Sequence, residues 1–128
     1  MKILSWNVNG IRAVEKKGFI DYVRNSNYDI IGIQETKAQP DQLSEELLNI
    51  EGYKSYFKWA EKKGYSGVAI YSKEEPIEVS DMGVSDFDNE GRVIFQIVKM
   101  LGRELIIKLL SVRLCSIFVM KELQKEKT

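Results

Sequence analysis

The sequence contains no histidine, one cysteine and two prolines, and these scarcities exclude several classes of protein. Without histidine, the chain lacks the side chain that most often serves as a general base near neutral pH. Because Cys115 stands alone, no internal disulfide can form, and residues 1–10 lack the basic and then apolar layout of a secretory signal. We therefore expect the protein in a reducing, cytoplasmic environment.

Charge and hydropathy patterning exclude two further classes. Nineteen Lys and Arg balance nineteen Asp and Glu, so no global positive field draws the chain to nucleic acid, and such binding would need a local patch. The apolar run over 114–120 is far shorter than the about 20 residues needed to cross a bilayer. A composition of 44% hydrophobic and 30% charged residues is typical of an ordinary globular domain, or of part of a larger one.

Two strands with a helix between them are predicted at the start of the chain. Residues 2–8 are strand-like and end at an Asn-Gly turn, residues 12–25 show helical spacing, and residues 29–34 form an apolar run. Strands joined by such a crossover are normally parallel, so their carboxyl ends share one edge of the sheet. We expect Asn7 and Glu35 to lie side by side at this edge, where open α/β sheets bind ligands.

The rest of the chain is predicted to form one further helix and then mainly strands. The expected elements are an amphipathic helix over 41–50, antiparallel strands over 53–60 and 68–72, and a β-hairpin of strands 93–100 and 104–110. Strand alternation predicts that Trp6 and Trp59 belong to the core. From Ser111 the periodicity fades into an apolar stretch and then a charged end.

Taken alone, the polar residues near the sheet edge have ordinary explanations. A strand-end carboxylate such as Glu35 is often solvated or caps a helix, and asparagine is common before a turn, as at Asn7. Tyr65, in a glycine-flanked loop, is compatible with simple coverage of the sheet edge, and Arg92 with an ion pair to Glu90. The nearby lysines fit either a cationic rim or a solvated face; they are Lys58, Lys62, Lys63 and Lys73.

Four sequence motifs together carry a resemblance to a known family. They are LSWNVNGIR at 4–12, DIIGIQETK at 29–37, KGYSGVAIYSK at 63–73 and EGRVI at 90–94. Together they resemble the exonuclease III and apurinic/apyrimidinic endonuclease family of the endonuclease/exonuclease/phosphatase superfamily. The resemblance implies an α/β fold, the N-terminal half of a four-layer sandwich of two facing mixed sheets with outer helices. This half spans residues 1–107, and a divergent tail spans residues 108–128.

The resemblance also implies site residues and a hydrolase activity. Glu35 matches the family's magnesium-binding glutamate, Asn7 matches the asparagine beside the scissile phosphate, and both are implied catalytic and metal-binding residues. Gln34 resembles their hydrogen-bonded support. Positions of the DNA-contacting residues are matched by Tyr65, Arg92 and Asn9. At Asn9 some relatives carry aspartate, so a second carboxylate is missing.

The implied reaction is metal-dependent hydrolysis of DNA. A single glutamate can anchor Mg²⁺, with Mn²⁺ as an alternative, because these ions prefer oxygen ligands and keep several waters. Complete family members cut double-stranded DNA 5′ to an abasic site and remove nucleotides from 3′ ends, so abasic duplex DNA is the implied partner. The alternatives are another phosphodiesterase or phosphatase of the superfamily, a non-catalytic DNA-binding module, and a nonfunctional truncation product.

The family pattern stops after residues 105–107. The Gly-Asp-x-Asn and Ser-Asp-His segments, which activate water in the family, are missing from this sequence, so we expect the chain alone to be nearly inactive. Residues 119–127 resemble the helix before the Gly-Asp-x-Asn strand, which suggests a deletion or shifted reading frame over 108–118. Because the second sheet is expected largely from the missing half, we also expect an uncovered apolar sheet face that favours self-association.

Overall fold

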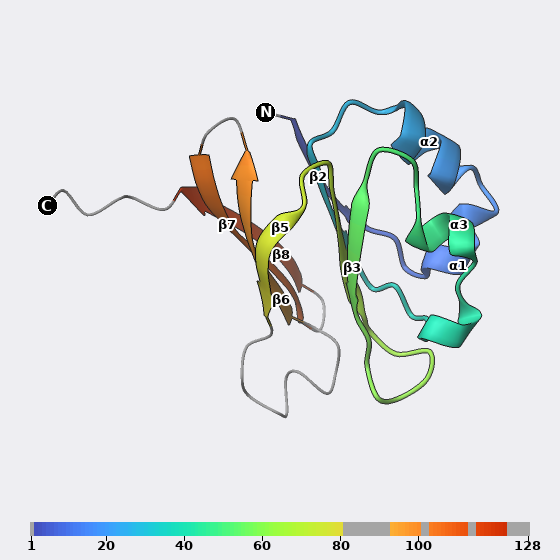
Figure 1. Ribbon diagram of the computed structural model, residues 1–128. Helices are drawn as coiled ribbons and strands as arrows, with labels where there is room; N and C mark the ends of the chain where they lie inside the picture. The colour runs from blue at the N-terminus through green and yellow to red at the C-terminus, as the bar shows by residue number, and fades with distance from the viewer. Residues whose placement is uncertain (1, 81–92, 101–102, 113–114, 123–128) are drawn as a thin grey trace, which may run out of the picture.

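The structure, a computed structural model, describes residues 2–80, 93–100, 103–112 and 115–122. Figure 1 shows these residues in three layers: helices, a first sheet and a second sheet. The helical elements are α1 (Ile11–Glu15), α2 (Phe19–Asn25), a 3₁₀ turn (Pro40–Gln42) and α3 (Glu45–Leu48). The strands are β1 (Ile3–Asn7), β2 (Ile30–Gln34), β3 (Lys54–Lys58), β4 (Val68–Ser72), β5 (Pro76–Ser80), β6 (Val93–Met100), β7 (Arg103–Val112) and β8 (Cys115–Glu122).

The first sheet is mixed and has the strand order β1-β2-β4-β3. The predicted parallel pairing of β1 with β2 is confirmed, and its register places Asn7 opposite Gln34. The predicted antiparallel pairing of β3 with β4 is also confirmed, and β4 pairs antiparallel with β2 as well. The chain therefore inserts β4 between β2 and β3, and every residue of β2 and β4 is buried.

Both predicted helices are interrupted, for reasons that are local. The segment 12–25 divides into α1 and α2 at Gly18, whose φ of 95° lies in the left-handed region that glycine adopts readily. Over 41–50 the chain forms a 3₁₀ turn and then α3, because Leu43 between them is extended. Ser44 begins α3 as its N-cap and accepts a hydrogen bond from the Leu47 amide at 3.2 Å. Within the described residues, no helix is long and apolar enough to cross a membrane.

The main core lies between the helices and the first sheet. Phe19 and Val23 of α2 and Leu47 of α3 are at most 1% exposed and belong to one cluster with the β2 and β4 side chains that face them. Trp6 packs against this cluster, with its ring centroid 5.6 Å from that of Phe19. Trp59 stacks on Phe57 at 4.8 Å, and Phe57 packs against the same core. The predicted packing of Trp6 against the core is therefore confirmed, whereas Trp59 is half-buried and reaches the core only through Phe57.

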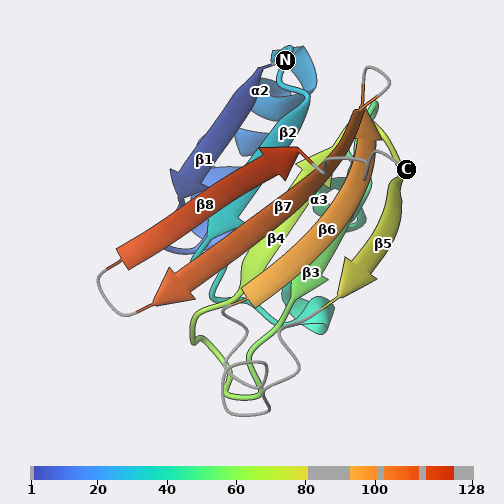
Figure 2. The ribbon, with the colours of Figure 1, turned by 90° about the vertical axis from the view of Figure 1, so that its left-hand side faces the viewer.

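The second sheet covers the other face of the first sheet and has the order β5-β6-β7-β8. Figure 2 shows its strands lying across β1–β4, and β6 and β7 contact strands of the first sheet. The expectation of an uncovered face is therefore wrong for the described residues, because this chain supplies the covering strands. The described pairings in this sheet are all antiparallel rather than mixed. For β6 with β7 and for β7 with β8, the two-residue connections are too short for a parallel crossover.

The divergent tail contributes to this second sheet. The predicted hairpin of β6 and β7 is confirmed, but β7 continues to Val112 and β8 then pairs antiparallel with it. Residues 119–122 are therefore strand rather than helix, which corrects the expectation for that segment. Their β-branched and aromatic neighbours in Cys115–Glu122 favour a strand beside β7.

Candidate functional site

The predicted site residues lie at the carboxyl edge of the first sheet. Asn7 ends β1, Gln34 ends β2 opposite it, and Glu35 follows directly. The register continues across the sheet from Gln34 through Val68 of β4 to Lys58 of β3. Asn7 is exposed and Glu35 is partly exposed, so both side chains are accessible to a ligand from solvent. The structure thus brings Asn7 and Glu35 to neighbouring strand ends, and their chemical roles remain predictions.

The backbone around Glu35 is held from two sides. On the β1 side, the Gly10 amide donates to the Glu35 carbonyl at 2.8 Å and the Ile11 amide donates to the Thr36 carbonyl at 2.9 Å. On the β4 side, the Thr36 amide donates to the Gly67 carbonyl at 3.0 Å. Glu35 itself has φ 55°, a left-handed conformation that costs a non-glycine residue about 1 kcal/mol. The surrounding hydrogen bonds offset this cost and fix the backbone that carries the carboxylate.

Asn9 is part of a polar chain that leads from Asn7 to Lys37. The Asn9 amide donates to Asn7 Oδ1 at 3.1 Å, and Lys37 Nζ donates to Asn9 Oδ1. The cation of Lys37 thus lies against the Asn9 side chain at this edge of the sheet. Sequence reasoning did not single out Lys37, because nothing in the local pattern shows a contact across 28 residues.

Gln34 is buried, and its side-chain hydrogen bond joins β2 to β1. Its Nε2 donates to Ser5 Oγ at 2.9 Å, two residues before Asn7 on β1. Its Oε1 is buried and has no hydrogen-bond partner within the described part of the chain. Gln34 therefore supports the alignment of the two strands, and the rest of its predicted supporting role stays a prediction.

The residues predicted to contact DNA are only partly brought to this edge. Tyr65 lies in the loop between β3 and β4 and is 40% exposed, with Lys62 Nζ 5.7 Å from its ring centroid. Arg92 lies outside the described residues. Of the predicted lysine rim, Lys58 ends β3 at the site edge, whereas Lys73 follows β4 at the opposite edge, where its amide donates to the Asp29 carbonyl. Lys73 is therefore not part of the rim, because β4 runs antiparallel to β2 and carries it away.

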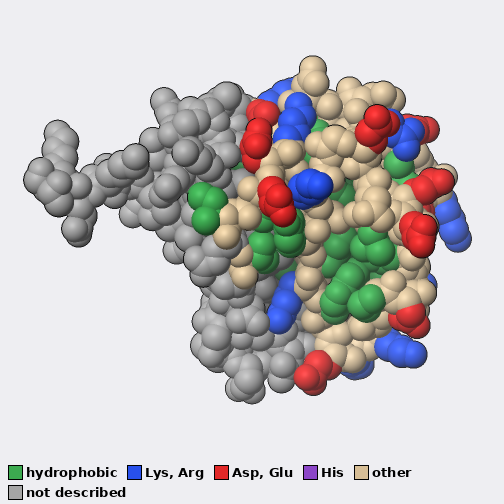
Figure 3. Space-filling view, viewed as in Figure 1, with side chains coloured by type: hydrophobic (Ala, Val, Ile, Leu, Met, Phe, Trp, Pro, Cys, Tyr) green, Lys and Arg blue, Asp and Glu red, His purple; other side chains and the backbone are tan. Residues whose placement is uncertain are grey.

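A hollow with a cationic wall adjoins the site. It has a volume of about 530 Å³, and Arg12, Lys16 and Lys37 line it together with Glu15. Arg12 Nη2 donates to the Lys37 carbonyl at 3.4 Å, so α1 and the loop after β2 meet there. On the face shown in Figure 3, cationic and anionic side chains are interspersed. Because positive and negative charges balance over the whole chain, attraction of a phosphate ligand would have to come from a local group of cations such as this one.

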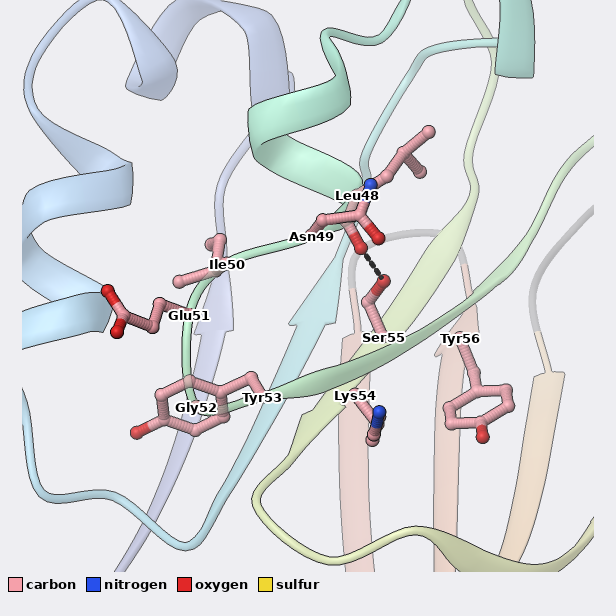
Figure 4. Close-up of a pocket in the computed structure, with 9 residues that line it drawn as sticks. All are labelled: Leu48, Asn49, Ile50, Glu51, Gly52, Tyr53, Lys54, Ser55 and Tyr56. Atoms are coloured by element: carbon pink, nitrogen blue, oxygen red, sulfur yellow. Dashed lines mark hydrogen bonds between the residues drawn. The ribbon is translucent and has the colours of Figure 1, made fainter.

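A second hollow lies at the opposite edge and is not part of the site. It has a volume of about 390 Å³ and is formed by the end of α3, the following turn and the start of β3. Figure 4 shows Ser55 Oγ donating to the Leu48 carbonyl, at 2.6 Å, along this segment. Because Lys54 begins β3 opposite Ser72, which is opposite Ile30 at the start of β2, this hollow lies at the other end of the strands from Glu35.

The donor atoms at the site fit a hydrated hard cation. They are the carboxylate of Glu35 and the amide oxygen of Asn7, both oxygen ligands of the kind that Mg²⁺ prefers. Asn7 Oδ1 also accepts a hydrogen bond from the Asn9 amide, at 3.1 Å. Among the described residues, no group of three or more His, Cys, Asp or Glu is placed to hold a metal ion. The site can therefore anchor a cation by one carboxylate but does not enclose it.

The fold and the strand-end residues together define an α/β protein with a carboxylate, Glu35, at the carboxyl edge of its first sheet. The sequence profile of the Endonuclease/Exonuclease/phosphatase family matches residues 4–105. The chain is 50% identical over 96 residues to an exodeoxyribonuclease of Bacillus subtilis, covering 73% of this chain and 37% of that protein. It is 40% identical over 95 residues to a DNA-(apurinic or apyrimidinic site) endonuclease of Dictyostelium discoideum, covering 73% of this chain and 26% of that protein.

A solved structure agrees with these sequence matches. The catalytic domain of Xenopus laevis APE2 superposes with a TM-score of 0.69 at 32% identity, over 84% of this chain and 43% of that chain. The chain belongs to the Endonuclease/Exonuclease/phosphatase family, and its relatives include exodeoxyribonucleases and apurinic or apyrimidinic endonucleases. It spans well under half the length of these relatives, so the activity of a whole protein does not follow from the match alone.

Proposed function

We propose that this chain is the N-terminal part of a DNA-repair nuclease that hydrolyses phosphodiester bonds with the help of a divalent cation. The observation that supports this most is the position of Glu35. Glu35 follows a fully buried strand and lies beside the end of β1, and the backbone of residues 35 and 36 is held by hydrogen bonds from both sides. A structural carboxylate needs no such positioning, whereas a metal ligand does.

Different residues of this chain are proposed to bind the cation and the DNA. Glu35 and Asn7 would hold Mg²⁺, or Mn²⁺ in its place, and the bound ion would polarise the phosphodiester and stabilise charge on the leaving oxygen. The hollow lined by Arg12, Lys16 and Lys37 fits the phosphates of a DNA strand, because cations fix the register of a duplex without reading its sequence. Tyr65 and Arg92 are proposed to add contacts to the backbone.

The proposed substrates follow from the relatives. Those relatives are named as an exodeoxyribonuclease and as apurinic or apyrimidinic site endonucleases. A 3′ phosphatase from Neisseria, which matches at 30% identity and a TM-score of 0.64, is solved bound to a product DNA hairpin. We therefore propose double-stranded DNA with abasic sites or 3′ ends as the substrate class. The complete fold is proposed to be a four-layer sandwich whose further strands supply the groups that activate water.

A titration of the chain with Mn²⁺, followed by electron paramagnetic resonance, tests the proposed metal site. Glu35→Gln should weaken Mn²⁺ binding at least about tenfold, because it removes the anchoring carboxylate and keeps the side-chain size. Glu46→Gln is the matched control, since Glu46 is an exposed carboxylate on α3. Equal Mn²⁺ affinity in the wild-type chain and Glu35→Gln would contradict the proposal.

A second candidate function is DNA binding without catalysis. The cationic hollow favours it, and it needs no further metal ligands beyond the described residues. Binding of duplex DNA that persists in EDTA and weakens steeply with salt would support this function. Binding that requires the divalent ion would instead favour the nuclease site.

A further inference from the structure

Three segments of backbone meet around Glu35, and we call this meeting point the Glu35 junction, comprising residues 8–11, 35–37 and 66–67. Glu35 and Lys37 have φ of 55° and 51°, and Ser66 and Gly67 have φ of 46° and 91°. Left-handed backbone is unfavourable for every residue here except glycine. Four residues with positive φ therefore lie in two segments, 35–37 and 66–67, that contact each other. We infer that this contact maintains the backbone conformation of both segments.

The two segments are joined by paired hydrogen bonds and by one very close packing contact. The Lys37 amide donates to the Ser66 carbonyl at 2.6 Å, next to the bond from the Thr36 amide to Gly67. A Cβ built at Gly67 would lie 2.1 Å from Thr36 Oγ1 and 3.4 Å from Thr36 Cβ. Thr36 is fully buried, and its Oγ1 has no hydrogen-bond partner within the described residues. Its side chain therefore acts here by packing against Gly67.

A second glycine of the same loop separates conformation from contact. Gly64 has φ 70°, so alanine there meets the same backbone restriction as at Gly67. Nothing lies within 4 Å of a Cβ built at Gly64. Alanine at Gly64 therefore measures the cost of the left-handed backbone, and alanine at Gly67 measures that cost together with displacement of Thr36.

We propose that Gly67 and Thr36 are positioning residues that set where the Glu35 carboxylate lies. Thr36 is the residue after Glu35, so displacing it moves the peptide that carries the carboxylate. The same loop carries Tyr65, two residues before Gly67, so the contact also ties the exposed phenol to the position of Glu35. The inference rests on the proposed function in one respect. It assumes that the Glu35 carboxylate is positioned to bind a divalent cation.

Amide hydrogen exchange of the full chain, measured by NMR, tests the positioning directly. Gly67→Ala should raise the exchange rates of the Gly10, Thr36 and Lys37 amides at least about tenfold, because their hydrogen bonds span the junction. Gly64→Ala should leave these three rates within about threefold of the wild-type values. Equal exchange in Gly67→Ala and the wild-type chain, or equal changes in both alanine variants, would overturn the proposal.

A second substitution, at Thr36, distinguishes loss of the Thr36 contact from a general loss of stability. Thr36→Ala removes the oxygen that a Cβ at residue 67 meets at 2.1 Å, so the double variant Thr36→Ala/Gly67→Ala should recover most of the wild-type protection. If Gly67→Ala does not fold, the double variant should fold. A double variant that remains as perturbed as Gly67→Ala, or also fails to fold, would show that the Thr36 contact is not the cause.

Mn²⁺ affinity separates this inference from the proposed function. If the wild-type chain binds Mn²⁺ through Glu35, Gly67→Ala should weaken that binding several-fold and the double variant should restore it. Unchanged Mn²⁺ affinity in Gly67→Ala, with Glu35→Gln still impaired, would overturn the positioning role alone. If Glu35→Gln does not alter Mn²⁺ binding, the proposed metal site fails, while hydrogen exchange still decides whether the Thr36 contact positions Glu35.

Discussion

At the scale of single residues, the backbone around Glu35 is the feature that most favours a ligand site. A carboxylate that were merely solvated would not need a left-handed backbone supported by amides of Gly10 and Ile11. The accompanying Asn7, Asn9 and Lys37 side chains form a connected polar group at the same edge. These contacts fix the backbone of Glu35 at the sheet edge, and the role of its carboxylate as a metal ligand stays a prediction.

Tyr71 is the residue whose ionisation should be visible in the stability of the protein. It is fully buried, and its hydroxyl donates to the Leu47 carbonyl at 2.7 Å. Burial, with a smaller contribution from the negative charge of Glu15, raises the pKa of Tyr71 well above its ordinary value. The folded chain keeps this proton at a pH where the unfolded chain loses it, so the contribution to stability is present below about pH 10 and falls above it.

Tyr71→Phe should therefore change the pH dependence of unfolding. At about pH 7 the variant should lose about 1 kcal/mol, because the Leu47 carbonyl loses its donor. At about pH 11 the difference should shrink or reverse, because phenylalanine has no proton to lose on unfolding. Urea denaturation of both proteins at the two pH values measures this difference. A constant difference between them would contradict the assigned ionisation.

At the scale of elements, short helices are held in place by caps and by tertiary contacts rather than by their length. α3 has four residues, too few to be stable alone. Ser44 caps it, and the Ser44 hydroxyl also donates to Glu15 Oε2 of α1 at 2.6 Å. The buried Leu47 then anchors α3 in the core. One serine therefore connects two helices and fixes the position of a core side chain.

Ser44→Ala should lower the free energy of unfolding by about 1 kcal/mol, because the Leu47 amide loses its cap. Thermal or urea unfolding followed by circular dichroism measures the loss. Glu15→Gln is the matched control, since the amide oxygen can still accept from Ser44 while the charge is removed. If Glu15→Gln costs as much as Ser44→Ala, the charged contact rather than the cap would be the dominant interaction.

At the scale of the whole molecule, the chain builds two facing sheets and leaves the chemistry incomplete. Its residues supply a hollow lined by cations and the proposed cation ligand Glu35, but the described part contains no group of three or more His, Cys, Asp or Glu placed to hold a metal ion. The sequence has no histidine that could act as a base. β1 and β3 are the edge strands of the first sheet, and β5 and β8 those of the second. Self-association through such edges stays a prediction.

The chain by itself should not cut DNA measurably. Phosphodiester hydrolysis needs an oriented and activated water as well as a cation, and the described residues offer no base for that water. Incubation with a duplex that contains an abasic site, in Mg²⁺, should give the same rate as an EDTA control. Metal-dependent incision that survives purification and is lost in Glu35→Gln would show that this chain carries a complete active site.

The sequence by itself determined the strand–helix–strand start of the fold and the placement of Asn7 and Glu35. Apolar runs, turn residues and the crossover length are local signals, and the parallel rule then brings the strand ends together. It also predicted the hairpin of β6 and β7. Sequence reasoning did not predict β8, the division of the helices, or the distance of Lys73 from the site.

Only the tertiary structure decided what surrounds Glu35. The contacts of Lys37 with Asn9 and of Thr36 with Gly67 join segments that are far apart in the chain, and no periodicity encodes such a pair. The same is true of β4, whose antiparallel pairing with β2 puts Lys73 at the opposite edge. Local propensity chooses each element, but long-range packing chooses the neighbours, and a binding site consists of neighbours.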